Sequence, residues 1–435
     1  MSFGGYDKYT TSGFSWLGDI PEHWKLKRLR YVAECLDGRR VPLNSVERAS
    51  MAGDIPYWGA NSVMDCVNKC LFDEELVLLG EDGAPFFEPN KIVAFYSSGP
   101  VWPNNHIHVL RTVEELSAWF LVHVLNITDY SGFVNGSTRD KLTQSAMAEI
   151  PIPFPPISEQ VAIASFLDQE TSKIDALITE QQRLIELLKE KRQAVISHAV
   201  TKGLNPDVRM KPSDVEWLGE VPEHWKVLPL KRLVASPITD GPHETPQFYD
   251  EGVPFVSAEA VSSGRIDFSK IRGCISPEDN ARYSLKYQPQ LYDIYMVKSG
   301  ATTGVTAMVE DRTDFNIWSP LAVVRCGVQV LPKFVLNVMR SRNFLDGVSL
   351  NWSFGTQQNI GMGVIENLHC PVPPESEQRA IISYLEDKLF GLGDLEAQAV
   401  AAIGLLQERR TALISAAVTG KIDVRNYAST QKDAA

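Results

Sequence analysis

Two stretches of this chain repeat apolar residues at the alternating spacing of three and four positions that is typical of coiled-coil helices. A helix with such a stripe needs a long apolar partner to cover it. Two similar stripes in one chain can cover each other, which predicts an intramolecular coiled coil; the alternative is that each helix packs only on its own domain. The predicted packing positions are Ile174, Leu177, Leu184, Leu188 and Val195 in the first stretch, and Leu392, Leu395, Leu406 and Leu413 in the second.

Both stretches begin in the same way. In the first, a proline pair precedes Ser158, a good N-cap residue, and Glu-Gln follows; the second repeats this arrangement around Ser376. These features predict two helix starts. Further along we expect a break near Thr171 in the first helix, matched by the helix-weakening Gly391 and Gly393 in the second.

The chain contains an internal repeat. The segment WLGDIPEHWK at residues 16–25 returns as WLGEVPEHWK at residues 217–226, with eight of ten positions identical and an offset of 201. PPISEQVAIASFLD, which starts at Pro155, matches PPESEQRAIISYLE, which starts at Pro373, with an offset of 218. We expect the shared tryptophans to anchor each domain to the helices: Trp16, Trp24, Trp217 and Trp225.

Between the repeated segments, short β-rich runs such as LVLLG at 76–80 and LAVVRC at 321–326 alternate with turns and helical pieces. This mixture predicts two compact α+β domains. The predicted organisation is a first domain at residues 1–157, a central helical region at 158–203, a linker at 204–216, a second domain at 217–373, a C-terminal helical region at 374–425, and a disordered tail at 426–435.

The composition limits the classes of protein to which this chain can belong. The chain has 435 residues, 44% of them apolar, which is enough for several cores. We find no 18-residue apolar run and no signal-like start, which predicts a cytoplasmic protein without a membrane partner. A net charge of −12 argues, taken alone, against nucleic acid as a partner, because phosphates must be neutralised by Lys and Arg.

Motifs for catalysis and for cofactors are missing from the sequence. It has no Walker A loop and no glycine-rich methyltransferase loop, and Asn205-Pro206-Asp207 lacks the second proline and the aromatic residue of a base-holding strip. We therefore predict no catalytic residue and no cofactor-binding residue in this chain.

The sequence offers weak candidates for metal ligands. His106 and His108 alternate on a predicted strand and so face the same side, but no third ligand accompanies them. Cys66 and Cys70 could share one face of a helical turn, but no second pair completes a site, so we expect them to be buried. No metal site is predicted.

Polar loops in both domains are the candidates for binding. Asn and Gln pair with adenine and Arg and Lys with guanine in the major groove, although ordinary surface loops have the same composition. The offset of 218 places Thr138 on Thr356 and Arg139 on Gln357, so the two domains present different side chains at one equivalent site. The candidate DNA-binding residues are Asn104, Asn105, His106, Ser137, Thr138, Arg139, Lys141, Lys298, Thr302, Thr303, Thr356, Gln357, Gln358 and Asn359.

The doubled segments, in this order, resemble the specificity subunits of Type I restriction-modification systems. The resemblance covers about residues 15–425 and extends to details such as LLGEDGAPF at 78–86, VWPNNHIHVLR at 101–111 and GATTG at 300–304. It implies an α/β (α+β) fold with two tandem target-recognition domains, related by a pseudo-twofold repeat and separated by two long helices in an antiparallel coiled coil.

The resemblance also implies a function and partners. Each domain would read one half of a bipartite, asymmetric site in double-stranded DNA, and the helices would set the spacer. Two modification subunits, with S-adenosylmethionine, would dock on the repeated regions and methylate adenine; restriction subunits, using ATP and Mg, would join them. The chain itself would be a non-catalytic subunit. A rival hypothesis is a two-headed scaffold that binds proteins or glycans.

Overall fold

The computed structural model describes residues 4–88, 90–135, 140–351, 359–425 and 427. The chain forms two compact units: unit 1 comprises residues 1–182 and 400–435, and unit 2 comprises residues 183–399. Each unit therefore contains an α/β part and a segment of both long helices.

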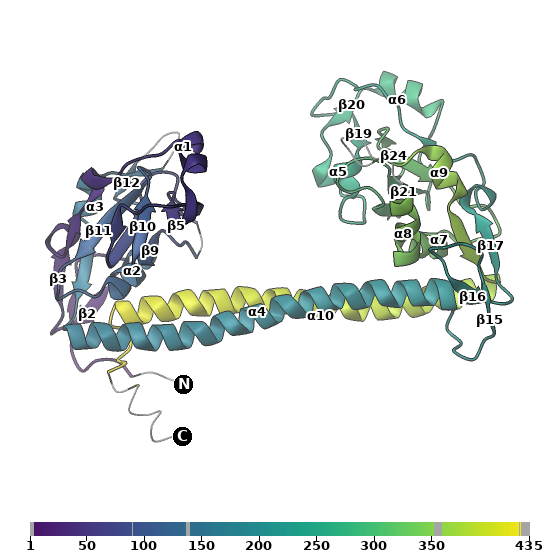
Figure 1. Ribbon diagram of the computed structural model, residues 1–435. Helices are drawn as coiled ribbons and strands as arrows, with labels where there is room; N and C mark the ends of the chain where they lie inside the picture. Colours follow the sequence, from purple (N-terminus) through teal and green to yellow (C-terminus); the bar gives the residue numbers. More distant parts are fainter. Residues whose placement is uncertain (1–3, 89, 136–139, 352–358, 426, 428–435) are drawn as a thin grey trace. The chain divides into compact units, whose positions relative to one another are not determined.

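Unit 1 is built on two four-stranded sheets (Figure 1). The first has the order β4-β11-β8-β9 and is antiparallel throughout: β4 (Ala33–Cys35), β11 (Ile107–Thr112), β8 (Leu76–Gly80) and β9 (Ala94–Ser97). The second has the order β6-β5-β10-β7, with β5 and β10 parallel: β6 (Val63–Val67), β5 (Ala52–Trp58), β10 (Pro100–Pro103) and β7 (Phe72–Asp73).

Smaller elements complete unit 1. Strand pairs join β1 to β2, β3 to β14, and β12 to β13: β1 (Tyr9–Thr11), β2 (Asp19–Pro21), β3 (Lys25–Arg28), β14 (Pro151–Phe154), β12 (Val134–Asn135) and β13 (Lys141–Leu142). The short helices are α1 (Ser45–Ser50), α2 (Ala118–Ile127) and α3 (Gln144–Ala148).

Unit 2 repeats this plan. Its main sheet has the order β18-β24-β21-β22 and a smaller sheet has the order β20-β19-β23: β18 (Thr239–Asp240), β24 (Leu321–Val324), β21 (Ile294–Val297), β22 (Thr306–Met308), β20 (Cys274–Ile275), β19 (Val253–Val256) and β23 (Asn316–Ile317). The remaining elements are β15 (Met210–Pro212), β16 (Glu220–Pro222), β17 (Lys226–Pro229), β25 (His369–Val372), α5 (Ala258–Val261), α6 (Pro277–Ser284), α7 (Pro332–Arg340), α8 (Arg342–Leu350) and α9 (Met362–Asn367).

The central strands explain why their sequences are continuously apolar. In β8, Val77 and Leu79 belong to one buried cluster, whereas Leu76 and Leu78 belong to another. Successive side chains of a strand point to opposite faces. A strand covered on both faces therefore needs an uninterrupted apolar run, and β21 in unit 2 divides between two clusters in the same way.

The predicted break in the long helices is wrong. Helix α4 (Ile157–Lys202) and helix α10 (Glu375–Val418) are each continuous. The Thr171 hydroxyl donates to the Leu167 carbonyl at 2.6 Å, so this side chain is satisfied inside the helix. Gly391 weakens a helix by only about 1 kcal/mol, which a helix of this length tolerates.

The two helices run antiparallel within each unit. In unit 1, Arg410 Nε lies 2.9 Å from Asp175 Oδ1, and in unit 2 an Arg192 nitrogen lies 4.0 Å from Glu396 Oε2. In unit 1, Ile163 and Leu167 of α4 share a buried cluster with Ala417 and Val418 of α10. In unit 2, Ile196 and Val200 share one with Ile381 and Leu385. Together with the ion pairs, these contacts show in each unit that residue numbers rise along α4 as they fall along α10. Of the predicted packing positions, Ile174 and Leu188 are buried and Val195, Leu392, Leu406 and Leu413 are partly buried; Leu177, Leu184 and Leu395 are 52%, 40% and 49% exposed.

The doubled sequence segments meet at the start of each long helix. In unit 1, Glu159 of α4 accepts a hydrogen bond from Trp24 Nε1 at 2.8 Å and lies 2.7 Å from His23 Nε2. In unit 2, Glu377 of α10 has the same relation to Trp225 (2.9 Å) and His224 (2.6 Å). Trp24 and Trp225 therefore attach each domain to a helix, as the repeat predicts.

The glutamine of each doubled segment ties the domain to the same helix end. Gln160 Oε1 accepts from the Ser117 amide at 2.8 Å, just before α2, and its Nε2 donates to the Glu115 carbonyl at 2.8 Å. Gln378 accepts from the Leu331 amide at 2.8 Å, just before α7. Both glutamines are buried, so each pair of bonds is shielded from water.

Candidate functional site

In unit 1, the predicted residues at 104–106 and Lys141 lie around the junction of β8, β11 and β13. Asn104 is buried, and its Oδ1 accepts a hydrogen bond from the His106 amide at 2.7 Å, so this side chain holds the turn. Asn105 is exposed. His106 Nδ1 lies 2.6 Å from Asp82 Oδ1, and Lys141 Nζ lies 3.2 Å from Glu81 Oε1.

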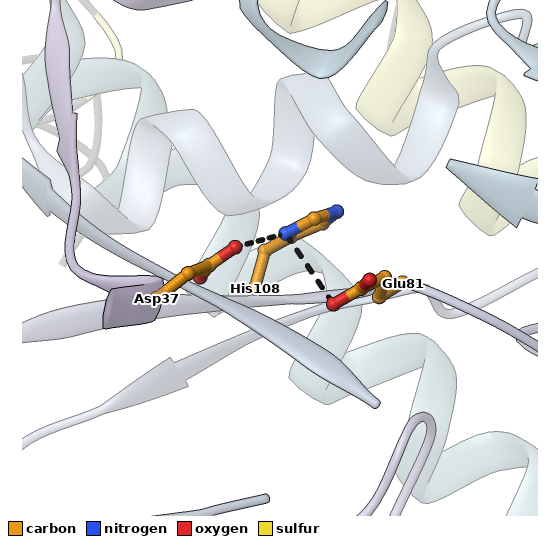
Figure 2. A group of neighbouring side chains, drawn as sticks. All are labelled: Asp37, Glu81 and His108. Carbon is orange, nitrogen blue, oxygen red and sulfur yellow. Dashed lines mark hydrogen bonds and ion pairs between the residues drawn. The ribbon is translucent and has the colours of Figure 1, made fainter. Parts of the chain in front are cut away.

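Beneath this surface lies a buried charged cluster (Figure 2). His108 on β11 is fully buried; its Nδ1 lies 2.6 Å from Asp37 Oδ2 and its Nε2 lies 2.8 Å from the Leu142 carbonyl. Both partners are hydrogen-bond acceptors, a carboxylate oxygen and a backbone carbonyl. Arg40 donates to Glu81 at 2.7 Å and lies 3.4 Å from Asp37.

The surroundings of Asp37 stabilise its charge. Burial raises the pKa of this carboxyl, but the hydrogen bond and charge of His108, the Val109 amide and the Arg40 guanidinium together lower it to about 2. Asp37 Oδ1 accepts from the Val109 amide at 2.8 Å, and Oδ2 also accepts from Gln144 at 2.8 Å. The carboxylate therefore joins β11 to the segments on either side of it.

By distance alone, Asp37, Glu81 and His108 could hold a metal ion, since one ligand atom from each lies within 4.8 Å of the others. The Arg40 guanidinium, however, already binds both carboxylates, and both ring nitrogens of His108 face acceptors. These contacts fit a hydrogen-bonded ion network better than a metal centre. His106, the other histidine of the predicted pair, contacts Asp82 instead.

In unit 2, the equivalent cluster is centred on Asp240. Lys298, at the end of β21, forms an ion pair with Asp240, and Lys286 Nζ lies 2.5 Å from the other oxygen of that carboxylate. Burial opposes these contacts, but the two lysines lower the pKa of Asp240 below its ordinary value. Thr302 and Thr303 are partly buried in the turn after β21, and Asn359 is exposed.

Strand register shows that the two clusters occupy the same place in the repeat. The Leu142 amide donates to the Glu81 carbonyl at 2.7 Å, and the Ile360 amide donates to the Lys298 carbonyl at 2.8 Å. Residue 142 matches 360 with the offset of 218. Glu81 in unit 1 is therefore equivalent to Lys298 in unit 2.

The same comparison extends to the neighbouring positions. Asp82 bridges Lys141 in one unit and Ser299 bridges Asn359 in the other. His108 pairs with Leu79, and Ala322 pairs with Met296, at equivalent points of the two sheets. One backbone arrangement thus carries different side chains in the two units.

Known proteins are similar to this chain in sequence and in fold. The profile of the Type I restriction modification DNA specificity domain matches residues 21–188. The chain is 29% identical over 369 residues to a putative type I restriction enzyme specificity subunit of Haemophilus influenzae, covering 83% of this chain and 86% of that one. It is 23% identical over 433 residues to the MjaVIII specificity subunit of Methanocaldococcus jannaschii, covering 94% and 95%.

Over most of its length the chain is similar to specificity subunits of type I restriction-modification systems.

A solved structure has the same fold. A chain in a structure of a type I restriction-modification system aligns with a TM-score of 0.65 at 16% sequence identity, covering 92% of this chain and 98% of that chain. The mixed α/β units and the long helices described above are therefore those of a known architecture.

Several predicted contact residues lie outside the part of the chain that the structure describes. Those outside the described residues are Ser137, Thr138, Arg139, Thr356, Gln357 and Gln358. Lys141 of β13 and Asn359, which follow these loops, keep the offset of 218 that aligned the loops in the sequence.

Two features of the chain differ from expectation. Cys66 and Cys70 are exposed rather than buried, because Cys66 lies on the edge strand β6 and Cys70 in the following turn. Among the described residues, one helix, α10, is long enough and over one 18-residue window apolar enough to cross a membrane, with a mean hydropathy of 1.4, and only 11% of that window is buried.

Sequence reasoning missed the buried cluster. Asp37 and His108 are 71 positions apart, and nothing in their local sequence links them. The contacts of Glu159 and Glu377 could have been predicted from the sequence, because both the glutamate and its His-Trp partners occur twice in the internal repeat.

Proposed function

We propose that this chain reads a bipartite, asymmetric DNA sequence, with each unit recognising one half. The observation that carries this proposal is the equivalence of Glu81 with Lys298 and of Lys141 with Asn359 on one shared backbone arrangement. A scaffold kept constant while its charged and amide side chains change suits the recognition of two different base sequences.

Among the described residues, the exposed members of the predicted set are the best candidates for base contacts. These are Asn105 and Lys141 in unit 1 and Asn359 in unit 2. An amide side chain can pair with adenine and an ammonium group with guanine. The ion networks around Asp37 and Asp240 would hold these positions in place and would not contact DNA themselves.

The long helices are the proposed docking surface for two modification subunits. In unit 1, Ile157, Val161 and Leu405 on these helices are exposed, and Leu405 reaches 67%. In unit 2, Leu187 and Phe390 are exposed, and Phe390 reaches 82%. Exposed apolar patches of this kind mark interaction surfaces. We assign the apolar window of α10 to such a protein partner, in the cytoplasm, and not to a membrane.

The catalytic steps of the proposed system belong to its partners. S-adenosylmethionine would bind to the modification subunits, and ATP and Mg to the restriction subunits. This chain would determine which DNA sequence is recognised and the distance between its two halves. We also propose that it has no catalytic activity of its own, in keeping with a sequence that lacks both a nucleotide-binding loop and a methyltransferase loop.

The test is a genome-wide map of methylated bases in cells that contain the modification subunit, with and without this chain. We expect N6-methyladenine at one bipartite, asymmetric motif only when the chain is present. The matched control is the chain with α4 disrupted by Leu188→Pro, since proline breaks a helix interior. A motif that appears equally without the chain contradicts the proposal.

A further inference from the structure

Two equivalent glutamates have different surroundings in the two units. Glu159 and Glu377 each bind a tryptophan and a histidine of the same doubled segment. The side chain of Glu159 is only 8% exposed, whereas that of Glu377 is 40% exposed. Something covers the first carboxylate that does not cover the second.

In unit 1 the cover is a tyrosine and an arginine. The Tyr6 hydroxyl donates to Glu159 Oε2 at 3.2 Å, and its ring lies 5.8 Å from that of Trp24. Arg425 lies over the Tyr6 ring at 4.8 Å and brings one guanidinium nitrogen within 4.0 Å of Glu159 Oε1. Both residues come from segments outside the sheets, near the two ends of the chain.

In unit 2 the same place is open. The offset of 201 puts Asp207 where Tyr6 stands, and Asp207 is exposed, with its amide bonded to Asn205 at 3.0 Å. A cavity of about 290 Å³ lies beside Glu377, lined by His224, Ala380, Ile381 and the segment 202–205. Lys202 does not neutralise the carboxylate, because its ammonium group donates to the Glu220 carbonyl at 2.7 Å.

We propose that this cavity binds the guanidinium group of an arginine side chain from a protein partner, in the place that Arg425 and Tyr6 fill in unit 1. Glu377 supplies the acceptor, and the apolar wall formed by Ala380 and Ile381 packs against the alkyl stem. Arginine fits better than lysine because its planar fork can bind a carboxylate while stacking on the His224 ring.

The partner that we assign is a modification subunit, and this identification rests on the proposed function. The cavity lies at the start of α10, on the helix pair where docking is proposed. The chemistry of the cavity can be tested without that partner and without DNA. A negative result would therefore remove the arginine site and leave the recognition of DNA intact.

The experiment follows the indole N–H signals of the full-length chain, labelled with ¹⁵N at tryptophan, by NMR. The probe is Nα-acetyl-arginine amide, and the matched probe is Nα-acetyl-citrulline amide, which has the same shape without the charge. Trp225 reports on Glu377 and Trp24 reports on Glu159, because each indole donates to its own carboxylate. The variants Trp225→Phe and Trp24→Phe assign the two signals.

We expect the Trp225 signal to shift with the arginine probe and to saturate around 10 mM, as for a single half-exposed ion pair. The Trp24 signal should not move, and citrulline should move neither. In the double variant Tyr6→Ala, Arg425→Ala, the Trp24 signal should also respond. If Trp225 is silent, or if Trp24 responds equally in the natural chain, the proposal is wrong; both readings come from the natural sequence, so they do not depend on a variant that folds.

Discussion

Each unit has a buried aspartate at one edge of its main sheet, Asp37 just after β4 and Asp240 in β18, and the two units neutralise this charge with different partners. In unit 1, Asp37 is bound by His108, by Arg40 and by the backbone of β11. In unit 2, Asp240 is bound by two lysines, Lys286 and Lys298. In unit 1 the side chains of His108 and Asp37 are 0% and 2% exposed, whereas in unit 2 Lys298 is 11% and Lys286 49% exposed.

This difference shows how one scaffold can carry two specificities. The backbone bonds that join the end of β8 to Leu142 recur at the end of β21. The side chains there have changed sign, from Glu81 to Lys298, and the counter-charges have changed with them. The framework can therefore stay constant only if each buried charge keeps a partner.

Lengthening both long helices should increase the distance between the two units without altering the half-site that each recognises. Four residues inserted in register into α4 and into α10 add about 6 Å, nearly two base pairs at about 3.4 Å each. We expect methylation of the original motif to be lost and a motif with the same halves and a longer gap to appear, as read by methylation mapping. An altered half-sequence with an unchanged gap would show that the units and the spacing are not separable.

Removing His108 should destabilise unit 1 strongly. His108→Ala leaves the buried Asp37 charge without its principal partner, which costs about 3–5 kcal/mol. Hydrogen exchange of the β8 and β11 amides measures this loss in unit 1. The matched change in unit 2, Lys298→Ala, leaves Lys286 on Asp240 and should cost on the order of 1 kcal/mol. Equal losses of stability for the two variants would show that the two buried aspartates do not differ in this way.

Acid should weaken unit 1 through Asp37. The folded pKa of about 2 lies below the ordinary value of an aspartate, so the stabilisation is present above about pH 4 and is lost as the pH falls toward 2. The contribution is about 2 kcal/mol. Urea unfolding at pH 5 and pH 2.5 measures it, and Asp37→Asn should reduce the difference between the two pH values. An unchanged difference in that variant would exclude Asp37 as its source.

The two helix-anchoring glutamates should differ by a smaller amount. Glu159→Gln weakens a buried set of bonds to Trp24, His23 and Tyr6, and should cost about 2 kcal/mol. Glu377→Gln acts at a half-exposed position and should cost about 1 kcal/mol. Hydrogen exchange near each helix start gives both values from one protein preparation. A larger loss of stability for Glu377→Gln than for Glu159→Gln would contradict this expectation.

Much of the fold could be predicted from local sequence. The β-rich run LVLLG marked the strand β8, and the proline pair before Ser158 marked the start of α4. The break near Gly391 was predicted wrongly, because helix propensity is weak beside the packing of a helix of 44 residues. Local pattern also could not tell that Leu177 and Leu395 are exposed, since a heptad does not show which partner covers it.

The site was less accessible to sequence reasoning. The loops around Asn105 and Lys141 were found from their composition, but the cluster beneath them depends on contacts between Asp37, Glu81 and His108, which lie far apart in the chain. Such contacts follow from strand register, and register is set by the whole sheet. The doubled glutamate and tryptophan were the exception, because the repeat marked both partners at once.

Each unit should read its half of the DNA site independently of the other unit. The most direct measurement replaces residues 26–150 with the corresponding segment of another specificity subunit and maps N6-methyladenine in cells that contain the modification subunits. We expect one half of the methylated motif to change while the other half is retained. A change in both halves would contradict it.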